Sequence, residues 1–133
     1  MLGVMKKYTV HIEDSRDSEP RPHERKAADI IAQLFKSDIV FMRRFQSKSP
    51  DLYVLKTNVR WELKSPIGGS KYTVQNNLRE TDGQSENVIL DLSRAKLTDR
   101  QGVSRAKEFI RDERSRIKRL KVLTKDKRLV DIK

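Results

Sequence analysis

A predicted β-hairpin over residues 51–64 is the feature that most constrains the fold of this chain. Asp51 opens an apolar run at residues 52–55, and a second run, residues 58–64, alternates between apolar and polar side chains. The segment between them, residues 56–58, is short enough to turn the chain back on itself. The two runs are therefore expected to pair as antiparallel strands.

The polar side chains of this hairpin could form a metal-dependent catalytic site. Successive residues of a strand point to opposite faces, so Glu62 and Lys64 share one face, and Trp61 and Leu63 share the other. A tight hairpin register would bring Asp51 beside Glu62. Two carboxylates offer the hard oxygen ligands that suit Mg²⁺, and Mg²⁺ keeps waters that can be activated or share the site with phosphate oxygens.

Lys64 has a chemical role in such a site. Its ammonium group could orient the attacking water and offset the charge that develops on the phosphodiester in the transition state. The alternative is an ordinary solvated pair, Glu62 and Lys64, on the polar face of an edge strand, which is the more frequent meaning of so short a pattern. The order of the surrounding elements bears on this choice.

A helix is predicted over residues 23–35, where apolar residues recur at helical spacing, and Pro22 fits its first turn. Glu24 lies in the same turn. The helix dipole alone could favour an acid at this position, or Glu24 could be an auxiliary acid at the edge of the buried stripe.

The other segments alternate between strand and helix patterns. Residues 71–80 are expected to form a helix that Ser70 could cap, with Gln75 and Arg79 on a face from which they could reach a phosphate. Thr98 begins a capping box with Gln101 for a helix that extends to about residue 116. Strands are expected at residues 38–45, 87–92, 120–123 and 129–132, the last two as a terminal hairpin.

This order of helix, three-stranded meander, helix and strand resembles the PD-(D/E)XK nuclease superfamily, with Asp51, Glu62 and Lys64 as the motif. The resemblance implies a three-layer, restriction-endonuclease-like α/β core with a mixed central sheet flanked by helices. Within the superfamily the chain looks most like the tRNA-nuclease domains at the C-termini of CdiA-type contact-dependent growth inhibition toxins. That likeness spans about residues 22–132 and also rests on residues 23–25, 68–69, 75–77 and 87–92.

The resemblance implies roles for particular residues. Asp51 and Glu62 would bind Mg²⁺, or Mn²⁺ or Zn²⁺ in its place, and Lys64 would be the catalytic lysine. Glu24 would be an auxiliary metal-binding or water-positioning acid, and Gln75 a further residue of the site. An acidic immunity or antitoxin protein is expected as a partner, because a cell that makes such an enzyme must protect its own RNA.

The domain is expected to span residues 20–133 after an N-terminal arm, residues 1–19. Residues 14–25 are rich in Ser, Pro and charge and lack periodicity, which is typical of poorly ordered segments. Nuclease domains of this type usually end a very long delivery protein, whereas a short arm precedes this one. The chain could therefore be an excised domain or an independent gene product, and the delivery route stays open.

The charge of the chain indicates a polyanionic partner. The sequence has 30 Lys and Arg against 19 Asp and Glu, a net charge of +11. Residues 94–133 hold 15 of the basic and 6 of the acidic side chains, a net charge of +9. Phosphate contacts are expected from this region and from the 71–80 helix, although a solvated helix face is the more frequent role of any single cation. The candidates are Arg79, Arg105, Arg111, Arg114, Arg116, Lys118 and Arg119.

Composition excludes several other classes. The 133 residues, 35% of them hydrophobic, suit one domain with a modest core. The absence of cysteine excludes disulfides, thiolate-bound zinc and a cysteine nucleophile. His11 and His23 are the two histidines, and His11 lies in a strand or tail, which gives a histidine-pair mechanism little support. No apolar run reaches membrane-spanning length, so the expected compartment is the cytosol of the producing or the target cell.

Three functions stay open at this point. The first is a Mg²⁺-dependent ribonuclease that acts on tRNA as a toxin, and the second is a restriction-like or junction-resolving DNase with the same centre. The centre cleaves either backbone, so the shape of the cationic surface decides between them. The third is a non-catalytic, basic nucleic-acid-binding protein, whose binding would survive Glu62→Ala and need no metal.

Overall fold

A seven-stranded mixed sheet forms the middle layer of the structure, a computed structural model that describes residues 7–13, 19–43 and 49–133. The strands lie side by side in chain order. β2, β3 and β4 form an antiparallel meander, β4, β5 and β6 are parallel, β1 is parallel to β2, and β7 is antiparallel to β6. The strands are β1 (Val10–Ile12), β2 (Ile39–Arg43), β3 (Pro50–Val54), β4 (Val59–Lys64), β5 (Asn87–Asp91), β6 (Arg119–Leu123) and β7 (Leu129–Asp131).

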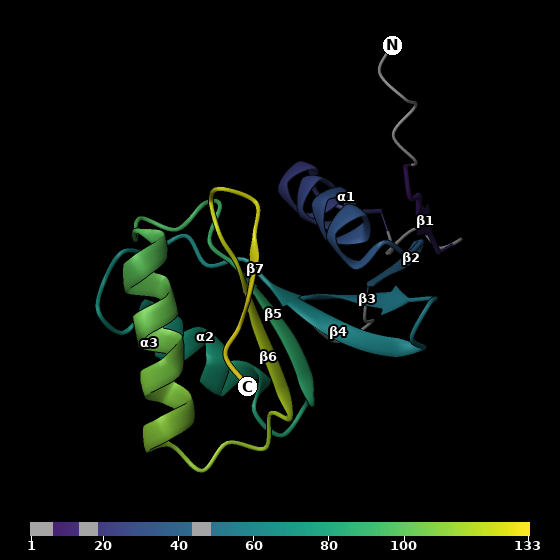
Figure 1. Cartoon of the computed structure of the whole chain (residues 1–133). Coiled ribbons are helices and arrows are strands. Elements are labelled where there is room, and N and C mark those ends of the chain that lie inside the picture. The colour runs from purple at the N-terminus through teal and green to yellow at the C-terminus, as the bar shows by residue number, and fades with distance from the viewer. Residues whose placement is uncertain (1–6, 14–18, 44–48) are drawn as a thin grey trace.

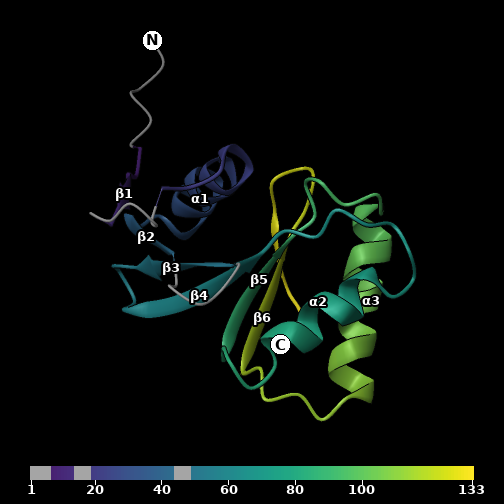
Figure 2. The same ribbon diagram turned by 180° about the vertical axis from the view of Figure 1, so that it is seen from behind.

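Helices cover both faces of this sheet. In the described residues these are α1 (Pro22–Phe35), α2 (Thr73–Thr81) and α3 (Asp99–Asp112). Figures 1 and 2 show α1 on one side of the sheet and α2 with α3 on the other. The expected three-layer α/β architecture with a mixed central sheet is confirmed.

Two apolar clusters, one on each face, hold the layers together. Ile31 of α1 packs in a cluster with Trp61, Leu63 and Ile89 of the sheet. On the opposite face, α2 and α3 pack in a second cluster with alternate residues of β5 and β6, among them Val88, Leu90 and Leu120. β5 thus contributes to both clusters, which explains its nearly continuous apolar sequence.

The predicted helices and strands form in the predicted order, and the differences lie at their ends. α3 ends at Asp112 rather than near residue 116, because Glu113 is extended and its carboxylate accepts two hydrogen bonds from Arg79. The capping box of Thr98 and Gln101 is confirmed, with reciprocal bonds of 3.0 and 3.1 Å. Residues 44–45 of the predicted first strand lie outside the described residues.

The expectation that Ser70 caps α2 is wrong. Tyr72 precedes the first helical residue, and the Ser70 hydroxyl accepts the N–H of Tyr72 at 3.1 Å. The Thr73 hydroxyl in turn accepts the N–H of Ser70 at 3.1 Å. These hydrogen bonds stabilise a turn that precedes the helix, and they do not cap the first turn of α2.

Part of the predicted N-terminal arm belongs to the sheet. β1 pairs with β2, and the amide of Thr9 and the ring of His11 both bond to the Asp38 carboxylate at 3.0 Å. The strand alternative for the segment around His11 is therefore confirmed, while residues 1–6 and 14–18 lie outside the described part. None of the helices found in the described residues is long and apolar enough to cross a membrane.

Candidate functional site

β3 and β4 place two buried carboxylates directly opposite each other. Asp51 and Glu62 are register partners in this antiparallel pair, and their side chains are 1% and 3% exposed. Glu62 is also the register partner of Val88, which packs under α2 and α3, so both acids face that layer. The predicted hairpin register is confirmed.

Polar neighbours contact both acids. The Ser85 hydroxyl donates a hydrogen bond of 3.0 Å to Oε1 of Glu62, from the segment between α2 and β5. The Nε of Arg60 lies 3.7 Å from Oδ2 of Asp51. Like charges at directly opposed strand positions destabilise a sheet, so a buried acid pair of this kind is a candidate functional feature.

Lys64 lies on the same face as Glu62 and is held by an acid that the sequence did not single out. Its Nζ is 2.8 Å from Oε2 of Glu80 on α2. The Lys64 side chain is 11% exposed and that of Glu80 is 66% exposed. The ion pair therefore fixes a nearly buried ammonium group from the solvent side. Lys64 and Glu80 are 16 residues apart and share no periodic pattern, so no sequence signal linked them.

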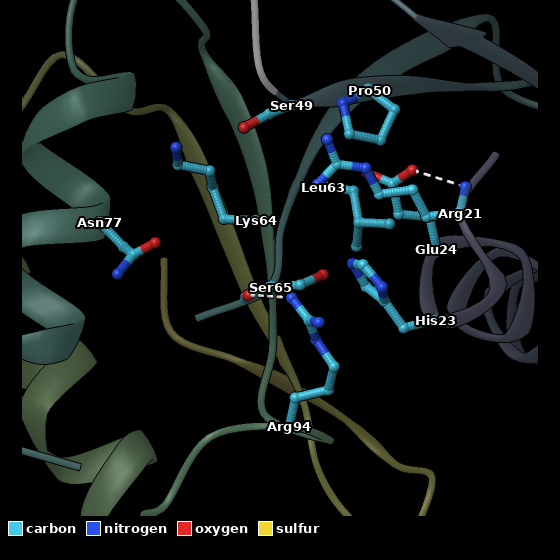
Figure 3. A pocket seen from close by; sticks show the side chains of 10 residues that line it. All are labelled: Arg21, His23, Glu24, Ser49, Pro50, Leu63, Lys64, Ser65, Asn77 and Arg94. Carbon is cyan, nitrogen blue, oxygen red and sulfur yellow. Dashed lines mark hydrogen bonds between the residues drawn. The ribbon is translucent and has the colours of Figure 1, made fainter. Parts of the chain in front are cut away.

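A small polar pocket lies beside Lys64, with a volume of about 120 Å³. Its walls come from the start of α1, the start of β3, the end of β4, α2 and the segment after β5 (Figure 3). Glu24 and Lys64 line it, whereas Asp51 and Glu62 do not. The lining residues are Arg21, His23, Glu24, Ser49, Pro50, Leu63, Lys64, Ser65, Asn77 and Arg94.

Glu24 is buried and bonded to its own helix end, where its Oε1 accepts the N–H of Arg21 at 2.9 Å. Besides any effect of the helix dipole, Glu24 thus caps the first turn of α1 through this hydrogen bond. Across the described residues, no three His, Asp or Glu side chains gather closely enough to hold a metal ion. The three predicted acids do not form one cluster, and the donor set that fits a hard cation is the pair Asp51 and Glu62.

Gln75 has a buried oxygen that the described residues leave without a hydrogen bond. Its Oε1 is inaccessible to solvent and finds no donor among them. A buried acceptor without a donor costs about 1–3 kcal/mol, and native structures keep few of them. Gln75 lies on α2 with Asn77, which lines the pocket, and Glu80, which holds Lys64. Its assignment as a site residue stays a prediction that this orphaned oxygen supports.

His23 and Arg94 line the pocket and Asp91 lies near them, an arrangement that the sequence did not indicate. Burial lowers the pKa of His23, and the nearby Arg94 cation lowers it further, against the opposing effect of Glu24 and Asp91. The ring is therefore mainly neutral at pH 7. Asp91 is fully buried, and its carboxylate accepts the backbone N–H and the hydroxyl of Ser93 at 2.9 and 3.0 Å.

Most of the predicted cationic contacts have partners within the protein. Arg79 bonds to Glu113, Arg105 to Glu108 and Arg111 to Asp112, while Lys118 pairs with Glu86. Exposed pairs of this kind are weak, so these side chains could exchange partners for phosphate at little cost. The structure leaves their role in binding nucleic acid untested, as it does for Arg114 and Arg116.

Lys118 and Arg119 lie at the start of β6. Glu62, Val88 and Leu120 are consecutive register partners across β4, β5 and β6. Arg119 directly precedes Leu120 and donates a hydrogen bond of 3.2 Å to Asn87. Successive residues of a strand point to opposite faces, so the side chain of Arg119 lies on the other face of the sheet from Leu120 and Glu62. Arg105 and Arg111 lie on α3.

Comparisons with known proteins add two findings. The family model described as "Contact-dependent growth inhibition CdiA C-terminal domain" matches residues 48–129, a span that includes Asp51, Glu62 and Lys64. Among solved structures, the chain is similar to one from the "CdiA-CT/CdiI toxin and immunity complex from Burkholderia pseudomallei", with a TM-score of 0.67 and 13% identity. The match covers 94% of this chain and 98% of that chain, and at this identity it shows the fold alone. No curated protein matches.

Proposed function

The chain belongs to the family of CdiA C-terminal domains of contact-dependent growth inhibition, and we propose that it is a toxin that cleaves tRNA as a metal-dependent endoribonuclease. The observation that carries this proposal is the buried pair Asp51 and Glu62, directly opposed on β3 and β4, with Lys64 on the same face. Together they match the motif of the PD-(D/E)XK nucleases, to which we assign the chain.

Asp51 and Glu62 would hold the metal ion, because they supply two carboxylates on neighbouring strands inside a polar site. A divalent ion such as Mg²⁺ supplies an activated water and stabilises the negative charge of phosphodiester cleavage. Lys64 would donate hydrogen bonds to the reacting phosphate oxygens, and Glu80 would keep its ammonium group in place. Glu24 lines the neighbouring pocket, so it would position water or substrate there and would not bind the metal ion together with Asp51 and Glu62.

The substrate assignment rests on charge and on the resemblance to tRNA-nuclease domains. The net charge of +11 favours a polyanion. The acid pair itself would serve RNA or DNA. The choice of tRNA is therefore tested directly against duplex DNA.

We expect the purified protein to cleave total tRNA in Mg²⁺, to leave linear duplex DNA intact, and to lose all activity in EDTA. A denaturing gel of both substrates in both buffers gives the result, and Mg²⁺ added back in excess should restore cleavage. Cleavage of DNA alone would instead make the protein a DNase. Binding without cleavage of either substrate would leave a basic adaptor protein and refute the enzymatic proposal.

The solved neighbour is a toxin and immunity complex. We propose that this chain likewise has an immunity partner, with an acidic face that complements residues 94–133 and their net charge of +9. The product of the adjacent gene, added to the purified chain, is expected to form a stable complex and to stop cleavage of tRNA. Calorimetry at low and high salt should show that the affinity of the two proteins falls as the salt concentration rises. If the adjacent gene product neither binds nor inhibits, the proposal of a protected toxin fails.

A further inference from the structure

The pocket beside Lys64 gathers three cationic side chains from separate elements. Arg21 precedes α1, Lys64 ends β4, and Arg94 lies in the segment between β5 and α3. Figure 3 shows Lys64 and Asn77 on one side of the pocket, Arg21, Glu24 and His23 on the other, and Ser65 with Arg94 between them. Glu24 is the one carboxylate among the described lining residues, and its Oε1 already accepts the N–H of Arg21. The pocket is thus cationic and rich in hydrogen-bond donors.

Arg21 and Arg94 belong to the described arginines that have no acidic partner within the described residues. Within the described residues neither guanidinium forms an ion pair, and Arg94 makes one hydrogen bond, of 3.5 Å, to the Ser65 carbonyl. Arg79, Arg111 and Arg128, in contrast, each bond to a carboxylate at 3.0 Å or less. The planar donors at the pocket are therefore available to an anion from outside the protein.

A well-ordered turn carries Arg94 to the pocket. Both oxygens of the buried Asp91 carboxylate accept hydrogen bonds from Ser93, and the N–H of Ala95 bonds to the carbonyl of Leu92 at 3.1 Å. These contacts fix the backbone on both sides of Arg94. Asp91 thus acts as a positioning residue for an exposed guanidinium, which lowers the entropy that Arg94 loses when it binds a ligand.

We propose that this pocket binds a backbone phosphate of the nucleic-acid substrate next to the phosphodiester that is cleaved, with Arg94 and Arg21 as its main contacts. Among the lining residues that the structure describes there is no Phe, Tyr or Trp, so this part of the pocket suits recognition of charge rather than stacking of a base. The N-terminus of α1 adds the positive end of a helix dipole. Because Lys64 lines the pocket and shares a face with Glu62, a phosphate held here adjoins the acid pair without occupying it.

This inference rests on the proposed nuclease function for the identity of its ligand, so its test measures binding in the absence of cleavage. Fluorescence anisotropy of a short labelled RNA in EDTA compares the wild-type protein with Arg94→Ala, Arg21→Ala and Arg94→Lys. Arg94→Ala is expected to weaken binding about tenfold and to reduce the slope of log affinity against log salt by about one. Arg94→Lys should recover part of the affinity, because it keeps the charge without the planar fork.

Arg100→Ala is the matched control, since Arg100 is an exposed arginine of α3 that lies outside the pocket. It removes the same charge and is expected to change affinity less than twofold. Equal losses in Arg94→Ala and Arg100→Ala would overturn the proposal, because they would show an effect of net charge alone. Thermal unfolding of each variant separates lost binding from lost structure.

A titration with inorganic phosphate, followed by amide chemical shifts, gives a second readout that needs no RNA. Shifts centred on residues 21–24, 64–65 and 93–95 that disappear in Arg94→Ala are expected. Shifts centred on residues 114–119 would overturn the proposal. If Arg94→Ala binds RNA and cleaves tRNA like the wild-type protein, the proposed phosphate site is wrong and the proposed nuclease activity stands. If phosphate binds at the pocket but the protein cleaves no tRNA, the nuclease proposal is wrong and the phosphate site stands.

Discussion

Replacement of Glu62 by Gln is expected to lower the rate constant for tRNA cleavage by about 10³-fold or more while the fold stays intact. The amide keeps the shape of the side chain and can still accept the hydrogen bond that the Ser85 hydroxyl donates. It removes the negative charge that would hold a divalent cation opposite Asp51. Single-turnover cleavage of labelled tRNA at saturating Mg²⁺ measures the effect.

The same substitution is expected to leave the thermal stability unchanged or to raise it. Asp51 and Glu62 are both buried at opposed strand positions, so loss of one charge relieves repulsion in the metal-free protein. Glu86→Gln is the matched control, because Glu86 is 63% exposed in the segment before β5 and pairs with Lys118. It should cleave at nearly the wild-type rate. Wild-type activity in Glu62→Gln would place the chemistry away from the acid pair.

The hairpin that carries the acid pair could be predicted from the sequence because its determinants are local. Alternation in residues 58–64 sets the faces of the strand, and a short connection leaves few registers for the two strands. The structure pairs Asp51 with Glu62 as this argument requires. The apolar run of β5 and the capping box of Thr98 are similarly local, and both are confirmed.

The surroundings of the acid pair could not be predicted in the same way, because they join segments distant in sequence. Arg94 meets the Ser65 carbonyl across 29 residues, and Ser85 meets Glu62 across 23. No periodicity or spacing encodes these contacts, which depend on how α2 and the turn after β5 pack on the sheet. Tertiary contacts also end α3 early, since Glu113 leaves the helix to bond with Arg79.

Charge by itself gave an incomplete picture of the binding surface. Arg105 and Arg111 were candidates because their region is basic, yet each pairs with an acid of its own helix. Arg94 was not a candidate, although it faces the pocket without an acidic partner. What matters for a phosphate site is the convergence of unpaired donors from several elements, and sequence composition does not record convergence.

Replacement of Lys64 by Met is expected to lower the cleavage rate by about 10²–10³-fold, because Met keeps the aliphatic stem and removes the ammonium group. Lys71→Met is the control, since Lys71 is an exposed lysine outside the pocket. Glu80→Gln should cost less, about tenfold at most, because Glu80 positions Lys64 and does not contact the substrate.

The double variant of Lys64→Met and Glu80→Gln separates positioning from a general effect of α2. If Glu80 acts through Lys64, the second substitution changes nothing once the lysine is gone, and single-turnover rates of the two Lys64→Met proteins coincide. Additive losses would mean that Glu80 acts independently of Lys64. If the Lys64→Met protein cleaved tRNA at the wild-type rate, Lys64 would have no role in the mechanism, and its ion pair with Glu80 would be only a structural contact.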